Sequence, residues 1–178
     1  TSASELRRIY RTPVLRVPTN RPPRRERLPD YVFGTALRKY EAIVEEVVKM
    51  HAAGRPILIG TRSIDKSEVL SRLLDEAGIP HEVLNANKVA EEAEIVARAG
   101  SHGKVTVATN MAGRGTDVKL ERSIEALGGM HVICTEFHDA ARIDRQLIGR
   151  CGRQGDRGSY RQYLSLDDDI LKNGLGPV

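Results

Sequence analysis

The sequence predicts an α/β fold in which helices cover both faces of a doubly wound, mostly parallel sheet. Short apolar runs alternate with longer segments whose apolar residues recur every three or four positions. This is the pattern of strands alternating with amphipathic helices. The short runs show little alternation of apolar and polar residues, as expected for strands buried on both faces. Right-handed crossovers then produce a doubly wound sheet, whose ligands bind beyond the carboxyl ends of the strands.

Each expected element after residue 33 has its own sequence signal. Thr35 is a suitable N-cap for a helix that ends at Gly54, and Ser63 caps a second helix that ends at Gly78. The expected apolar face of the first helix comprises Leu37, Tyr40, Ile43, Val44, Val47 and Val48. Further helices are expected at 89–99 and 140–149, and strands at 57–60, 81–84, 104–108, 130–134 and 161–166. The carboxylates at 167–169 suit the N-terminus of a last helix.

Residues 1–33 are expected to form an extended linker that precedes the domain. They contain five of the eight prolines, and proline removes a backbone donor and disfavours helix in the residue before it. A short strand is expected at 14–17. The compact domain is expected to comprise residues 34–170, and residues 171–178 would begin a following segment or tail. Because the chain starts at Thr1 without a methionine, we expect it to be a segment of a longer protein.

Charge is distributed unevenly along the chain. The net charge is +4, but residues 1–30 hold eight arginines against three acidic residues, so the body is close to neutral. The body is therefore unlike a basic nucleic-acid platform, while the arginines at 21–27 form either a solvated linker or a binding element. No apolar run is long enough to span a membrane. Cys134 and Cys151 do not form a CxxC pair, which fits a reducing compartment better than a disulfide scaffold or a zinc site.

The stretch VTVATNMAGRGTD, residues 105–117, is expected to run from a strand into a loop. Gly113 and Gly115 allow the backbone to approach a ligand closely, and the guanidinium group of Arg114 suits phosphate. Asp117 can accept hydrogen bonds from ribose hydroxyls or pair with Arg114. By itself the stretch fits a tight turn with a local ion pair as well as it fits a phosphate site.

The stretch QLIGRCGRQGD, residues 146–156, carries a second candidate site. Arg150 and Arg153 are three residues apart, so one helical turn would place both on the same side. Each lies beside glycine, and no acidic residue shares their turn. Surface arginines contribute little to stability, so this pattern favours phosphate binding over a solvated basic helix.

Other polar groups have simpler interpretations. Lys104 does not belong to a phosphate loop, because the pattern GxxxxGK[ST] is absent. His131 is expected to be a hydrogen-bonded core histidine. The polar residues of 136–139 are consecutive loop positions without a second cluster, which argues against a metal site. We therefore expect no metal ligands in this chain.

These stretches resemble those of a known family. Residues 109–117 resemble motif V of the superfamily 2 motor ATPases in the form typical of SecA, and residues 146–156 resemble their motif VI, QxxGRxGRxG. Other SecA-like stretches lie at 18–22, 60–68, 83–86 and 142–146, so the resemblance extends from about residue 9 to 169. It implies the second of two RecA-like domains that hold ATP between them in a SecA-type preprotein translocase ATPase.

The resemblance also implies roles for individual residues. Arg150 and Arg153 correspond to arginine fingers that reach the β- and γ-phosphates, and Gln146 corresponds to the residue that couples nucleotide to domain closure. The residues expected to contact nucleotide are Gly113, Arg114, Gly115, Asp117 and Gln154. The cofactor would be ATP or ADP with Mg²⁺, and the Mg²⁺ ligands would come from the first motor domain. Without a phosphate loop, this chain is not expected to hydrolyse ATP by itself.

The implied partners are the first RecA-like domain, the SecYEG channel and unfolded preproteins, with an acidic phospholipid surface as a further partner and no nucleic acid. The implied location is cytoplasmic and peripheral, at the inner face of the bacterial cell membrane. Two alternatives remain. The equivalent domain of a nucleic-acid helicase would bind DNA or RNA with steep salt dependence, and the near-neutral body argues against it. A non-enzymatic binding module would not need the two glycine-flanked arginines.

Overall fold

The computed structural model describes residues 2–15, 17–84, 89–109 and 117–174. The strands are β1 (Arg24–Arg27), β2 (Tyr31–Phe33), β3 (Ile57–Thr61), β4 (Glu82–Leu84), β5 (Val105–Thr109), β6 (Met130–Cys134) and β7 (Arg157–Ser165). The helices are α1 (Ser2–Tyr10), α2 (Ala36–Ala52), α3 (Ile64–Glu76), α4 (Val89–Arg98), α5 (Arg122–Ala126), α6 (Ala141–Ile148) and α7 (Asp169–Gly174). None of these helices is long and apolar enough to cross a membrane.

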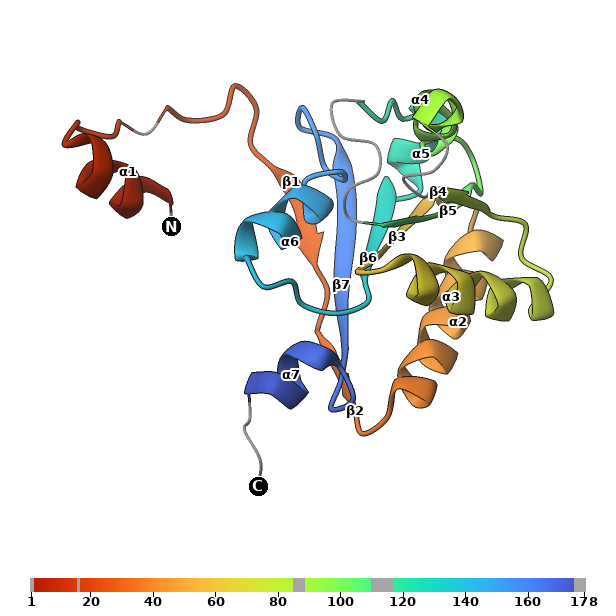
Figure 1. Cartoon of the computed structure of the whole chain (residues 1–178). Helices are drawn as coiled ribbons and strands as arrows, with labels where there is room; N and C mark the ends of the chain where they lie inside the picture. Colours follow the sequence, from red (N-terminus) through yellow and green to blue (C-terminus); the bar gives the residue numbers. More distant parts are fainter. Residues whose placement is uncertain (1, 16, 85–88, 110–116, 175–178) are drawn as a thin grey trace.

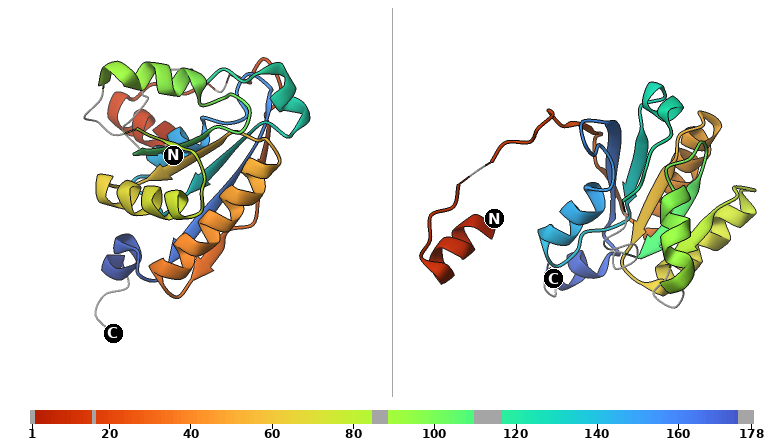
Figure 2. Two further views of the ribbon diagram at one scale, coloured as in Figure 1. Left: turned by 90° about the vertical axis from the view of Figure 1, so that its right-hand side faces the viewer. Right: turned by 90° about the horizontal axis from the view of Figure 1, so that it is seen from above.

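Within these ranges, seven strands form one sheet in the order β1-β7-β6-β3-β5-β4, and β2 continues the pairing along β7. Every pair is parallel. Helices cover both faces of the sheet, while α1 lies to one side of the body (Figures 1 and 2). The predicted doubly wound α/β fold is therefore confirmed.

The two faces of the sheet carry separate hydrophobic cores. Ile57 and Ile59 of β3 pack with the buried side of α2 and α3. Leu58, between them, packs on the opposite face with Val96 of α4 and Leu147 of α6. Because successive strand residues alternate between the faces, burial of both faces requires an unbroken apolar run. That requirement explains why the central strands could be located from the sequence.

Local signals also placed the first two helices of the body correctly. The Thr35 hydroxyl accepts a hydrogen bond from the Arg38 N–H at 3.4 Å, so Thr35 is the N-cap of α2. The Ser63 hydroxyl accepts one from the Lys66 N–H at 3.3 Å and caps α3. After these helices, Gly54 and Gly78 adopt φ angles of 74° and 68°, in the left-handed region that favours glycine.

The expectation of an extended linker in residues 1–33 was partly wrong. Residues Ser2–Tyr10 are helical, and the described residues of 14–17 form no strand. Instead β1 and β2 pair with β7, so the sheet begins before the expected boundary at residue 33. The prolines at 22, 23 and 29 flank these strands and do not interrupt their ladders. β1 consists only of charged residues, and its pairing partner is remote in sequence, so no local pattern revealed it.

The predicted apolar face of α2 was also partly wrong. Leu37 and Val48 are exposed, whereas Lys39 and Glu46 are buried beside Ile43. Each of these charged side chains has partners on other elements. Burial of a charge is tolerated when it is paired and hydrogen-bonded, so tertiary partners overrode the apolar pattern.

Glu46 is the centre of a buried polar network between α2, β6 and β7. Its Oε1 atom lies 2.9 Å from His131 Nε2, and its Oε2 atom accepts hydrogen bonds from Arg161 Nη1 at 2.8 Å and from the Tyr163 hydroxyl. His131 Nδ1 lies 2.8 Å from the Ser159 hydroxyl, which confirms the expected core histidine. Burial alone would raise the pKa of the Glu46 carboxyl, but interactions with His131 and Tyr163 outweigh burial, so this pKa is lowered.

We expect Glu46→Gln to lower the free energy of unfolding by about 1–3 kcal/mol at neutral pH, because buried donors lose a charged acceptor. A carboxyl whose pKa is lowered by folding stabilises the fold above its ordinary pKa of 4.5, and this contribution is lost as the pH falls through the folded value. The difference between Glu46→Gln and the unaltered chain should therefore shrink in acid. Denaturant titrations across pH test this, with Glu45→Gln at the exposed neighbouring position as control. A difference that grows in acid would contradict it.

Candidate functional site

The predicted finger residues follow α6, which packs closely on the sheet. A side chain at Gly60 would bring its Cβ to 2.1 Å from Leu147 Cδ2, so α6 can approach β3 only because residue 60 is glycine. Gln146 is exposed on α6. Arg150 is half-buried just after the helix, and its N–H donates to the Leu147 carbonyl at 2.9 Å. The buried Leu147 thus fixes the end of α6, and Arg150 and Arg153 follow this end.

An ion pair between Arg153 and Asp117 brings the two candidate stretches together. Arg153 Nη1 lies 2.9 Å from Asp117 Oδ1, and the two side chains are 39 % and 48 % exposed. Arg153 is therefore not folded into the interior. An exposed ion pair contributes at most about 1 kcal/mol, so Arg153 can exchange this carboxylate for a phosphate at little cost.

The structure describes some of the other residues that were predicted to contact nucleotide, but not all of them. Gln154 is exposed and has a φ of 54°, a left-handed conformation that is uncommon outside glycine. The Arg153 carbonyl accepts from the Asp156 N–H at 2.8 Å, which closes the turn around Gln154. Gly113, Arg114 and Gly115 lie outside the described residues. The pairing of Asp117 with Arg153 was not among the alternatives that the sequence suggested.

Cys151 lies between the two arginines and anchors their loop in the core. It is 1 % exposed, and its thiol donates to the Ile148 carbonyl at 3.4 Å. Burial raises the pKa of the Cys151 thiol to about 11 and also raises that of Cys134. Both cysteines are free, so they act as small apolar side chains.

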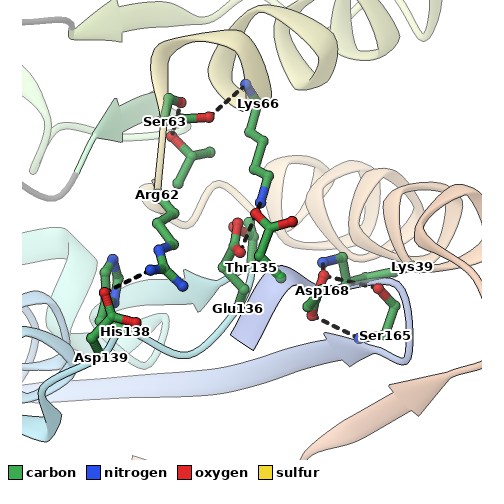
Figure 3. A network of polar contacts seen from close by, with 12 residues as sticks. Lys39, Arg62, Ser63, Lys66, Thr135, Glu136, His138, Asp139, Ser165 and Asp168 are labelled. Carbon is green, nitrogen blue, oxygen red and sulfur yellow. Dashed lines mark hydrogen bonds and ion pairs between the residues drawn. The ribbon is translucent and has the colours of Figure 1, made fainter. Parts of the chain in front are cut away.

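A second polar cluster lies at the carboxyl ends of β3, β6 and β7 (Figure 3). Lys66 Nζ lies 2.8 Å from Glu136 Oε2 and 3.0 Å from Asp169 Oδ2. Burial would lower the pKa of Lys66, but these two carboxylates outweigh burial and raise it. Arg62 Nη2 lies 2.6 Å from Asp139 Oδ2. These ion pairs join the start of α3 to the loop after β6 and to α7.

The same edge contains a buried ion pair between Lys39 of α2 and Asp168. Asp168 also accepts hydrogen bonds from the N–H and the hydroxyl of Ser165, both at 2.8 Å. The sequence analysis missed this pair, although Lys39, Ile43 and Val47 recur at intervals of four. A lysine in step with apolar residues on a helix was the available signal of a buried charge.

The polar residues after β6 each have a separate partner. Glu136 pairs with Lys66 and Asp139 with Arg62, as above, while His138 Nδ1 lies 2.6 Å from Asp144 Oδ1. Across the described ranges, no group of three histidine, cysteine or acidic side chains is placed to hold a metal ion. The three pairs link this loop to the start of α3 and to α6.

Comparisons with known proteins identify the family. The family model described as "SecA P-loop domain" matches residues 22–126 and 121–175. Over all 178 residues the chain is 75 % identical to the protein translocase subunit SecA 2 of Rhodopirellula baltica, of which it covers 27 %. It is 54 % identical over 172 residues (97 % of this chain) to the SecA subunit of Clostridium perfringens, of which it covers 20 %. The chain thus spans about a quarter of the length of these relatives.

Solved structures agree on the fold. The DEAD-box protein SrmB of E. coli, solved with the regulator of ribonuclease activity A, superposes with a TM-score of 0.64 at 22 % identity, covering 89 % of this chain and 86 % of that one. Domain 2 of the DEAD-box helicase Mss116p, solved with an RNA duplex, gives 0.60 at 17 % identity, covering 87 % and 61 %. At such identities the likeness concerns the RecA-like fold alone. The family match and the SecA relatives, which cover this chain almost end to end, show that it belongs to the SecA P-loop domain family.

Proposed function

We propose that this chain is the second RecA-like motor domain of a SecA-type ATPase that drives unfolded preproteins through the SecYEG channel. The observation that carries the proposal is the 2.9 Å contact between Arg153 and Asp117. It brings the ends of motifs V and VI together at a solvent-accessible surface. In this proposal the motor domain comprises residues 34–170 together with β1 and β2, and residues 171–178 begin the following segment.

The chemistry of this surface fits a nucleotide held by a facing domain. Negative charge on the γ-phosphate and the leaving group must be stabilised in the transition state, and an arginine from a second domain supplies that stabilisation. Arg150 and Arg153 serve as these fingers, and Asp117 accepts hydrogen bonds from the ribose. Gln146 on α6 couples nucleotide to closure, while Gly113, Arg114, Gly115 and Gln154 complete the contact surface.

ATP and Mg²⁺ would be held by the first motor domain, because this sequence contains no GxxxxGK[ST] loop. Loss of the γ-phosphate would remove the contact to the fingers, so hydrolysis would reopen the two domains. The relatives are named protein translocase subunits, which supports SecYEG and unfolded preproteins as partners. A cytoplasmic position at the inner face of the membrane, beside acidic phospholipids, follows from the same proposal.

The test is which partner stimulates ATP hydrolysis by the full-length protein. We expect vesicles that contain the channel, together with an unfolded preprotein, to increase turnover severalfold, because partner binding favours the closed arrangement of the two domains. Duplex RNA and single-stranded DNA should leave turnover unchanged. Stimulation by nucleic acid that weakens steeply with salt would instead support the equivalent domain of a helicase, and no turnover under any condition would support a binding module.

A further inference from the structure

Arg25 belongs to the arginine-rich stretch at 21–27. The sequence alone fits either a solvated linker or a binding element there. In the structure Arg25 is a half-buried residue of β1, and its Cα pairs in register with Gly158 of β7. This pairing places it beside the loop that carries the finger residues. Arg25 Nε donates a hydrogen bond to the Cys151 carbonyl at 2.9 Å.

The glycines of the finger loop allow this approach. A Cβ at Gly152 would lie 2.8 Å from Arg25 Cβ, and one at Gly155 would lie 2.9 Å from Arg21 Cβ. A Cβ at Gly158 would lie 2.6 Å from the Gly152 nitrogen. A side chain at one of these positions would therefore push the loop away from β1, from the segment before β1 or from β7. Gly152, which lies between Arg150 and Arg153, therefore serves the contact with β1 as well as leaving the guanidinium groups uncrowded.

The contact falls at Cys151, one of the two residues that separate Arg150 from Arg153. The Cys151 side chain is buried in the core and its carbonyl accepts a hydrogen bond from Arg25, so the peptide between Cys151 and Gly152 has little freedom. Gly152, with a φ of 61°, and Arg153 follow directly. Fixing this peptide restricts the directions in which both guanidinium groups can extend.

We propose that Arg25 is a positioning residue for the arginine fingers, and that it acts through the Cys151 carbonyl without touching nucleotide. The inference rests on the proposed function, because the proposed role as fingers is what requires Arg150 and Arg153 to be held in place. It also gives β1 a mechanical role. A displacement of the segment that enters the domain would be transmitted to the finger loop.

The experiment compares variants of the full-length translocase in steady-state ATP hydrolysis. Arg25→Met keeps the length of the side chain but has no donor, and it should lower kcat roughly tenfold to a hundredfold through misplacement of the fingers. The KM for ATP should change little, because the lost interaction belongs to the transition state. Arg25→Lys retains a donor and should recover most of kcat. Arg24→Met is the matched control, since Arg24 lies in the same strand and its side chain forms an exposed ion pair with Glu125.

A double variant separates positioning from general stability. If Arg25 acts through the fingers, adding Arg25→Met to Arg153→Ala should cause a much smaller loss than it causes in the unaltered protein. The proposal is overturned if Arg25→Met has the same kcat as Arg24→Met, or if Arg25→Lys is as impaired as Arg25→Met. It is also overturned if the losses in the double variant multiply fully. A normal kcat in Arg153→Ala would instead refute the proposed function.

Discussion

Replacing Arg153 by alanine should lower the ATP turnover of the full-length translocase by roughly a thousandfold to a hundred-thousandfold, the range measured for arginine fingers. The ion pair with Asp117 is exposed, so the Arg153 side chain contributes little to the stability of the fold. Its removal should therefore cost little stability while it removes charge stabilisation from the transition state. A large loss of kcat with a nearly unchanged unfolding temperature is the expected signature.

The matched control is Arg157→Ala, because Arg157 is an exposed arginine at the start of β7, four residues further along the chain. Turnover should be measured with the channel and preprotein present, and ATP binding should be measured separately by fluorescence or calorimetry. Retained binding with lost turnover places the effect in the chemical step. Equal turnover in the Arg153 and Arg157 variants would show that Arg153 is not a finger.

Replacing Lys39 by methionine should destabilise the fold by about 3–5 kcal/mol, because the buried carboxylate of Asp168 would lose its countercharge. Lys39 and Asp168 are 1 % and 3 % exposed, so water cannot replace the lost partner without opening the structure. Two hydrogen bonds from Ser165 would remain, but they do not neutralise the charge. For a chain of this size the midpoint of thermal unfolding should fall by about 10 °C or more.

Lys172→Met provides the control for this prediction. Lys172 Nζ lies 3.6 Å from Asp167 Oδ1, and both side chains are largely exposed, so its loss should cost less than about 1 kcal/mol. The double variant Lys39→Met/Asp168→Asn should recover part of the stability, because no isolated charge remains buried. Similar unfolding temperatures for Lys39→Met and Lys172→Met would contradict the assignment of a structural role to the buried pair.

Some features of the candidate site could be predicted from short stretches of sequence, whereas others depend on contacts between residues far apart in the chain. Arg150, Arg153 and Asp117 were predicted from short patterns of glycine, arginine and aspartate, because the proposed phosphate-binding surface needs these residue types at close spacing. The contact of Arg153 with Asp117 was not predicted, since thirty-five intervening residues have to fold first. Arg25 gave no signal beyond membership of an arginine cluster, because its role depends on the distant Cys151 carbonyl.

The sequence by itself determined the fold class, the caps of α2 and α3, the central strands and the two motifs. Each of these depends on interactions within a few residues or on burial that leaves an apolar run. Only the tertiary structure decided that the charged strand β1 joins the sheet, that Lys39 and Glu46 are buried, and that the two motifs meet. These outcomes depend on a hydrogen-bonding or ionic partner from elsewhere in the chain, and the free energy of such a pair exists only once folding has brought both members together.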